Sequence, residues 1–157
     1  PLARSPAVSA QEVLANVSAV SLQGRALLIE GPSGSGKSSL ALALIDRGAV
    51  LIGDDAVTIA ASDGRCLVSP PPRIAGLIEV RNIGLVTLPT AVAPLALVLS
   101  LDPGAPRYPL EDRFRRRAGC DIPLIAFAPG DAVQALRAEY ALEKHGLRFS
   151  RAPERAT

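Results

Sequence analysis

The chain has 157 residues, of which 48% are hydrophobic, 20% charged and 3% aromatic, and its formal net charge is +2. This length is typical of one domain with a real core, which must be built from Ala, Val, Leu and Ile because aromatic residues are few. The small charge and the few stacking side chains argue against nucleic acid as a partner. Two separated cysteines and one histidine exclude a disulfide framework and a zinc site of recognisable spacing.

The sequence predicts a cytoplasmic protein with no membrane partner. No positively charged segment followed by an apolar run opens the sequence. The longest apolar run, residues 91–101, contains a proline and is shorter than the roughly 20 residues that cross a bilayer. Residues 1–8 lack hydrophobic periodicity and contain two prolines, so we interpret them as a tail. We interpret residues 9–150 as one domain and residues 151–157 as a C-terminal tail.

Turn signals and apolar runs divide this domain into strands and helices. The strands predicted in chain order are 17–22, 25–30, 49–53, 56–60, 65–69, 77–88 with a bend, 95–101 and 122–127. One helix is predicted over 37–47, ending at Gly48, and another over 132–145 with Asp131 as its N-cap. Residues 102–120, rich in Pro, Gly and Arg, show weak periodicity. The pattern predicts an α/β fold with a mixed sheet and flanking helices.

A glycine-rich loop lies between the strand at 25–30 and the helix at 37–47. Its sequence GPSGSGKS matches the phosphate-loop pattern G-x-x-x-x-G-K-[ST] without a mismatch. Glycines let backbone N–H groups converge on phosphate oxygens, the lysine places a charge on the terminal phosphates, and the serine hydroxyl ligates Mg²⁺. The predicted nucleotide-binding residues are Gly31, Pro32, Ser33, Gly34, Ser35, Gly36, Lys37, Ser38 and Ser39.

Two adjacent carboxylates follow the next apolar strand. Asp54 and Asp55 come directly after residues 49–53, and the ends of strands in an open α/β sheet face the ligand crevice. We therefore expect both side chains near the bound phosphates. One carboxylate of such a pair suits a metal ion and the other suits a general base. A turn or a helix cap is the alternative interpretation, since Asp favours both.

The motifs together resemble a known family. GPSGSGKSSLALALIDRGAVLIGDDAV, followed by LIEVRNIGLV, resembles the catalytic domain of HPr kinase/phosphorylase, and is most similar to the short single-domain form found in α-proteobacteria. The resemblance extends over residues 14–145 and implies that family's P-loop fold. It also implies an ATP- and Mg²⁺-dependent kinase that phosphorylates a serine of the phosphocarrier HPr. Phosphorolysis involving phosphate and pyrophosphate, and assembly into a homo-oligomer, are further implications.

The resemblance also implies residue roles. Asp54 would accept the proton of the substrate serine, assisted by Lys37 and by Arg113 in the EDR sequence. Arg81 matches the family's signature arginine. The metal ligands that it implies are Ser38, Asp55 and Glu79. For Glu79, a solvated strand face is the alternative interpretation.

Four arginines cluster in PLEDRFRRRAG, residues 109–119, which we expect to form a mobile loop. Besides Arg113 they are Arg115, Arg116 and Arg117. An arginine here could stabilise a transferred phosphoryl group or bind an acidic partner. An ordinary solvated basic loop is the alternative interpretation.

Two departures from the family keep a second function open. Asn16 stands where the family has a histidine before the phosphate loop, and asparagine cannot titrate near neutrality. Asn82 replaces a glycine, although Asn tolerates left-handed backbone angles better than most residues. Asn16 slightly favours a nucleotide- or phosphate-sensing module that acts through protein contacts. The carboxylates Asp54, Asp55 and Glu79 favour the kinase.

Overall fold

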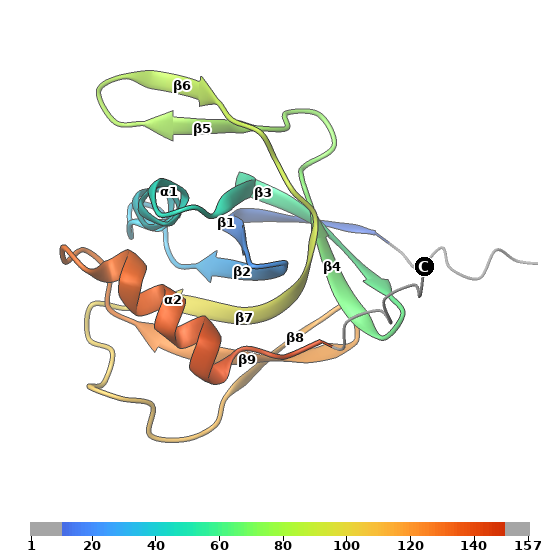
Figure 1. The fold of residues 1–157 in the computed structure, drawn as a ribbon, viewed down its shortest axis with the longest axis vertical. Coiled ribbons are helices and arrows are strands. Elements are labelled where there is room, and N and C mark those ends of the chain that lie inside the picture. Colours follow the sequence, from blue (N-terminus) through green and yellow to red (C-terminus); the bar gives the residue numbers. More distant parts are fainter. Residues whose placement is uncertain (1–10, 150–157) are drawn as a thin grey trace, which may run out of the picture.

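The computed structural model describes residues 11–149, so the predicted tails at 1–8 and 151–157 lie outside the described residues. Nine strands and two helices form within this described range, in the order shown in Figure 1. Their bounds are β1 (Glu12–Leu22), β2 (Arg25–Glu30), α1 (Lys37–Asp46), β3 (Val50–Ser62), β4 (Arg65–Ser69), β5 (Leu77–Val80), β6 (Gly84–Thr87), β7 (Ala93–Leu101), β8 (Phe114–Arg117), β9 (Cys120–Phe127) and α2 (Gln134–His145).

Strand β2 is paired on both sides, and this closes five strands into a ring. The sheet order runs β2-β1-β3-β4-β7, and β2 pairs with β7 as well. β2 is antiparallel to β1 and parallel to β7. β9 then adds to β7 in parallel, and β8 pairs with β9 in antiparallel orientation. The predicted mixed α/β architecture is confirmed, but the expected open sheet is wrong at the phosphate-loop strand.

The two faces of the ring strands build two separate cores. One cluster draws on β1, β2, β3, β4, β7 and β9 and on neither helix, which places it on the inner face of the ring. The other packs β1, β2, β3, β5, β7 and β9 against both helices. Successive residues of β2 alternate between the clusters, Leu27 and Ile29 facing the helices and Leu28 facing inward, as the strand period requires. Helices α1 and α2 therefore lie on the same outer side of the ring.

Several local predictions are confirmed and others need correction. The β1–β2 and β3–β4 hairpins form as expected, and α1 ends before Gly48, whose φ is 110°. Residues 77–88 form the hairpin β5–β6 instead of one bent strand, with Asn82 at φ 71° in the turn. Helix α2 begins at Gln134, because the Asp131 carboxylate accepts a hydrogen bond from the N–H of Val133 and holds a turn there.

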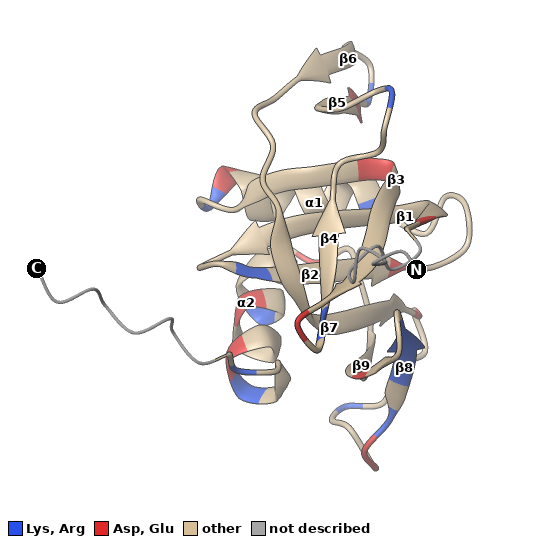
Figure 2. Ribbon diagram, turned by 90° about the vertical axis from the view of Figure 1, so that its right-hand side faces the viewer, with Lys and Arg blue, Asp and Glu red and all other residues tan. Residues whose placement is uncertain are grey.

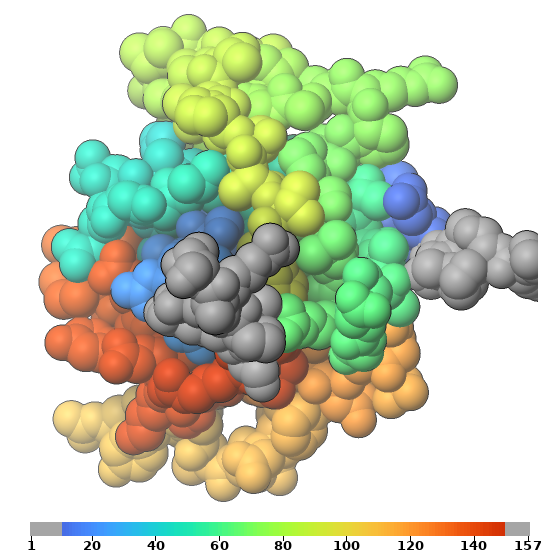
Figure 3. Space-filling model, turned by 45° about the vertical axis from the view of Figure 1, so that its right-hand side comes forward, coloured from blue at the N-terminus to red at the C-terminus, as the bar shows by residue number. Residues whose placement is uncertain are grey.

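The β5–β6 hairpin projects from the ring as a separate layer above α1 and β3 (Figures 1 and 3). It is tied to the outer core by Ile78, which is 1% exposed. Ile83 in its turn and Leu85 on β6 are exposed. One face of the hairpin therefore packs against α1 through Ile78. Side chains at alternate positions, such as Glu79, face the space beside the phosphate loop.

Among residues 11–149, no helix is both long and apolar enough to span a membrane. Both cysteines are free thiols. Burial raises the pKa of the Cys66 thiol to about 11, with a smaller contribution from Cys120. Cys66 is therefore protonated at neutral pH and behaves as a small core residue.

Candidate active site

The phosphate loop has the predicted strand–loop–helix arrangement. β2 ends at Glu30, and α1 begins at Lys37 after Gly36, whose φ of 104° lies in the left-handed region. Lys37 is 8% exposed, and its ammonium donates hydrogen bonds to the carbonyls of Gly31 and Pro32, at 2.7 and 2.9 Å. A Cβ at Gly31 would lie 2.6 Å from the Ser35 hydroxyl and 3.2 Å from the Leu101 Cβ, so a larger residue here would force Ser35 to shift. The loop is a compact cradle of backbone amides beside a fixed charge.

Asp54 and Asp55 lie at a bulge within strand β3. The prediction that they follow the end of a strand is therefore wrong. β3 continues to Ser62. Its pairing with β1 jumps from Ala15↔Ala56 to Ser18↔Asp54, so two residues of β1 lie opposite Asp55 alone. Asp55 has φ 72°, and Asn16 on the facing strand has φ 61°. Such a bulge re-aims side chains without ending the pairing.

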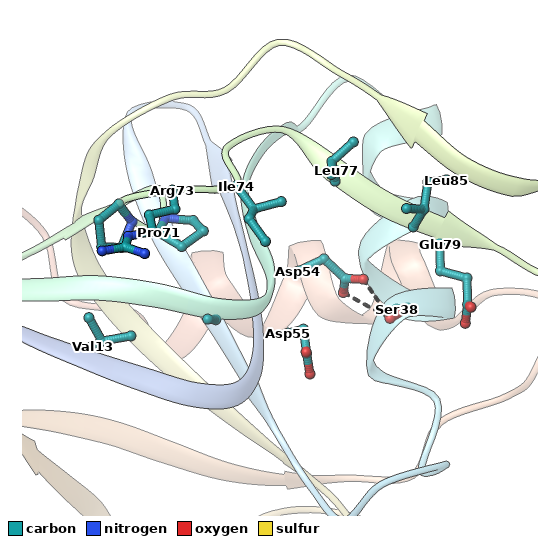
Figure 4. A pocket seen from close by; sticks show the side chains of 12 residues that line it. Val13, Ser38, Asp54, Asp55, Pro71, Arg73, Ile74, Leu77, Glu79 and Leu85 are labelled. Carbon is teal, nitrogen blue, oxygen red and sulfur yellow. Dashed lines mark hydrogen bonds between the residues drawn. The ribbon is translucent and has the colours of Figure 1, made fainter.

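The bulge brings Asp54 to the phosphate loop. The Ser38 hydroxyl lies 2.8 and 3.0 Å from the two carboxylate oxygens of Asp54, and the Ser18 hydroxyl donates a bond of 2.7 Å to one of them. Figure 4 shows Asp54 directed toward Ser38 and Asp55 pointing in a different direction. The carboxylate that contacts the phosphate-loop serine is therefore Asp54, and its two hydroxyl partners fix its orientation.

Sequence reasoning missed Ser18. Ser18 is 1% exposed, and its neighbours Val17 and Ala19 are core residues. A polar residue inside a run of buried apolar ones was the available signal, because a buried hydroxyl needs a partner.

Ser18→Ala is expected to lower the rate of the reaction catalysed at this site several-fold and to reduce the free energy of unfolding by about 1 kcal/mol. The variant removes one of two donors to Asp54, so the carboxylate is less well positioned. Initial rates at saturating substrate and denaturant titrations would measure the two effects. Ser21→Ala, on the same strand, is the matched control. Equal rates in the two variants would contradict a positioning role for Ser18.

A cavity of about 680 Å³ adjoins this carboxylate. At the phosphate loop its polar lining is Ser38, Asp54, Asp55 and Glu79, the last of these projecting from β5, and the only other charged lining residue is Arg73 (Figure 4). The remaining lining residues are Val13, Ala56, Pro71, Pro72, Ile74, Leu77 and Leu85. The cavity thus has an acidic end at the phosphate loop and a largely apolar remainder, and it brings together all of the predicted metal ligands.

The donor set fits a hard divalent cation. Mg²⁺ is usually held by one or two carboxylates and keeps several waters, and the acidic end supplies a hydroxyl and carboxylates only. Within residues 11–149, three or more His, Cys, Asp or Glu side chains do not gather into a preformed metal cluster. The arrangement therefore suits a metal ion that is coordinated partly by a bound phosphate. It suits less well a structural metal ion whose ligands all come from the protein.

The two predicted site arginines lie outside this cavity. Arg81 is exposed at the β5–β6 turn, and Arg113 is exposed just before β8; neither lines the cavity. The predicted loop is wrong at 114–117, which form β8, the basic strand in Figure 2. Arg115 and Arg117 both pair with Glu30, at 2.8 and 2.7 Å, and the Glu30 side chain is 12% exposed.

This ion-pair cluster was not predicted. Glu30 is the last residue before the phosphate loop, and alternate residues of β8 place two guanidinium groups on it. Arg116, on the opposite face of β8, pairs with Asp121 at 3.0 Å. Arg115 and Arg117 are two positions apart, so a strand places them on one face. Arg115 and Arg117 thus hold the end of β2 in place.

Known proteins resemble the chain in sequence and in fold. The family model of the HPr serine kinase C-terminal domain matches residues 8–92, just over half of the chain. HPr kinase/phosphorylase of Clostridium botulinum (strain Eklund 17B / Type B) is 51% identical over 67 residues, which cover 43% of this chain and 22% of that protein. The Enterococcus faecalis enzyme of the same name is 47% identical over 68 residues, again covering 43% and 22%. The chain matches about a fifth of the length of these relatives.

The fold agrees with the sequence match. The structure of the HPr(Ser) kinase/phosphatase from Coxiella burnetii superposes with a TM-score of 0.72 at 26% identity, covering 85% of this chain and 90% of that one. The matched family region, residues 8–92, contains both the phosphate loop and the Asp54–Asp55 bulge. The chain belongs to the HPr serine kinase C-terminal domain family.

Proposed function

We propose that this chain transfers the γ-phosphoryl group of ATP to a serine hydroxyl of the phosphocarrier HPr. The observation that carries the proposal is the contact of Asp54 with the phosphate-loop serine, Ser38, at 2.8 Å. It places a potential proton acceptor beside the expected position of the terminal phosphate. Family membership and the names of the relatives support the choice of acceptor.

The roles follow from charge and position. Lys37 and the backbone amides of the phosphate loop would hold the phosphates. The acceptor hydroxyl oxygen forms a bond to the γ-phosphorus, the bond from that phosphorus to the bridging oxygen breaks, and ADP leaves. Asp54 takes the hydroxyl proton. In the reverse phosphorolysis, inorganic phosphate would remove the phosphoryl group from phosphoserine as pyrophosphate, and Asp54 would return the proton.

Mg²⁺ supplies charge neutralisation on the transferring phosphoryl group when it is bound. Its proposed ligands are Ser38, Asp55 and Glu79, which line one cavity. Asn16 lies in the bulge opposite Asp55, and the resemblance implies that it stands where the family has a histidine. Because asparagine cannot exchange a proton near neutrality, Asp54 would act without a titrating neighbour on β1. Arg81 and Arg113 are proposed to contact the acceptor or the transferred phosphate from outside the cavity.

The test is incubation of the chain with γ-labelled ATP, Mg²⁺ and HPr from the same organism. We expect label on a serine of HPr, and no label on HPr in which that serine is replaced by alanine. Mass spectrometry of digested HPr identifies the labelled residue. Tight ATP binding without transfer would contradict the kinase and favour the nucleotide-sensing function instead.

A further inference from the structure

Three arginines at alternate positions lie along the strand at the edge of the seven-stranded sheet. Arg115 and Arg117 belong to β8, and Arg113 directly precedes it. The N–H of Leu124 donates a hydrogen bond of 2.9 Å to the carbonyl of Arg113, so the pairing of β8 with β9 continues as far as this residue. Because side chains two positions apart in a strand share a face, Arg113 extends the face that carries Arg115 and Arg117.

The direction of β8 brings this row of arginines toward the phosphate loop. β2 runs parallel to β7, β7 runs parallel to β9, and β8 is antiparallel to β9. β8 therefore runs opposite to β2, whose last residue directly precedes the phosphate loop. Arg113 is accordingly nearer to the phosphate-loop end of the sheet than Arg115 is, and Arg117 is the farthest of the three.

Glu30 holds two of these arginines from the end of β2. Its Oε1 accepts a hydrogen bond of 3.0 Å from Nε of Arg115 and lies 2.8 Å from Nη2 of the same group, and its Oε2 lies 2.7 Å from Nη2 of Arg117. The Glu30 side chain is 12% exposed and that of Arg117 is 23% exposed. Short charge-assisted bonds to a planar guanidinium fix its orientation as well as its distance. We call Glu30, Arg115 and Arg117 the Glu30 cluster; it ties β8 to the residue before Gly31.

The composition of the Glu30 cluster favours a role in positioning over a role in stability. Nε of Arg117 is buried without a hydrogen-bond partner among residues 11–149, and a buried unpaired donor costs free energy. The single carboxylate is shared by two guanidinium groups, so it has no charge left for a third. Arg113 is exposed, and its side chain has no hydrogen bond or ion pair within the described part of the chain. It is therefore available to an anion from outside the cluster.

We propose that the Glu30 cluster positions Arg113 beside the phosphoryl group bound at the phosphate loop. The inference rests on the proposed kinase function, in which Arg113 contacts the transferred phosphate. An arginine in that place stabilises the charge that develops as the phosphoryl group moves, and this stabilisation depends on the distance between the two groups. Glu30 acts through Arg113 and does not touch the substrate, so it is a positioning residue.

The test is Glu30→Gln, which preserves the size of the side chain and removes its charge. We expect kcat for transfer from ATP to HPr to fall about 10- to 100-fold, because a group that acts on the transition state is misplaced. KM for ATP should change by less than about twofold, since β2 stays paired on both sides and Lys37 is retained. Initial rates over a range of ATP concentrations measure both constants. Asp121→Asn, which breaks the ion pair of Arg116 on the opposite face of β8, is the matched control and should change neither.

A double-variant cycle separates positioning from a merely structural role. Glu30→Gln/Arg113→Ala should be no slower than Arg113→Ala alone, because the cluster then has nothing left to position. Arg115→Ala, at a side chain that is 38% exposed, should reproduce the fall in kcat if Glu30→Gln folds poorly.

Additive losses of kcat in the double variant would overturn the inference, and so would an unchanged kcat in Glu30→Gln or Arg115→Ala. Either result leaves the kinase activity of the unaltered chain in place. Absence of transfer by the unaltered chain would instead overturn the proposed function, and this inference with it.

Discussion

Asp54→Asn is expected to lower the rate of phosphoryl transfer to HPr about 10²–10⁴-fold, the usual contribution of a general base. The asparagine oxygen can still accept the hydrogen bonds from Ser18 and Ser38, so the geometry of the site is retained. What the variant loses is the ability to take the proton of the acceptor hydroxyl. Single-turnover transfer from labelled ATP would measure the rate, and equilibrium binding would show an ATP affinity changed by only a few-fold.

Two aspartates of the same strand–hairpin unit serve as comparisons. Asp63→Asn, at the exposed β3–β4 turn, should leave transfer unchanged. Asp55→Asn should shift the Mg²⁺ dependence of transfer more than its maximal rate, because Asp55 lines the cavity as a proposed metal ligand and the proposed proton acceptor is Asp54. A rate for Asp54→Asn close to that of the unaltered chain would remove the proton-acceptor role.

Lys37→Ala is expected to weaken ATP binding about 100-fold or more, since it removes the buried charge that is proposed to hold the terminal phosphates. The substitution also leaves the carbonyls of Gly31 and Pro32 without their donor. The free energy of unfolding should therefore fall by about 1–3 kcal/mol. Calorimetric titration with ATP and denaturant unfolding would measure the two effects.

Arg47→Ala is the control for this variant. Arg47 follows the opposite end of α1 and pairs with Glu139 at the surface, at 2.8 Å. An exposed pair of this kind contributes little to stability, so both ATP affinity and unfolding should change only slightly. Normal ATP affinity in Lys37→Ala would end the assignment of the phosphate loop.

Local signals in the sequence predicted the phosphate loop. The closed ring depends on pairing between strands that are distant in the chain, which the sequence did not reveal. The loop, its strand and its helix are adjacent in the chain, so spacing alone located Lys37 and Ser38. The closure of the ring joins β2 to β7 across the chain, with Leu28 opposite Val98. No pattern within either strand indicates that partner.

The same limit applies to the candidate site. The sequence placed Asp54 near the phosphates, but through a strand end that does not exist; the real cause is the bulge against β1. Gly53 supports that bulge, because a Cβ there would lie 2.3 Å from the carbonyl oxygen of Ala56. Ser18 and Glu30 acquire their roles only when β1 and β8 are assembled. Their residue types were visible, but their partners lie 36 and 85 positions away in the chain.

The closed ring also protects the strand that leads into the phosphate loop from unwanted association. A strand at a free sheet edge exposes unpaired N–H and C=O groups that can template pairing with another chain. β2 has neighbours on both sides, so it offers no such template. Cross-molecular strand addition, and the aggregation to which it leads, would have to begin at a more peripheral element.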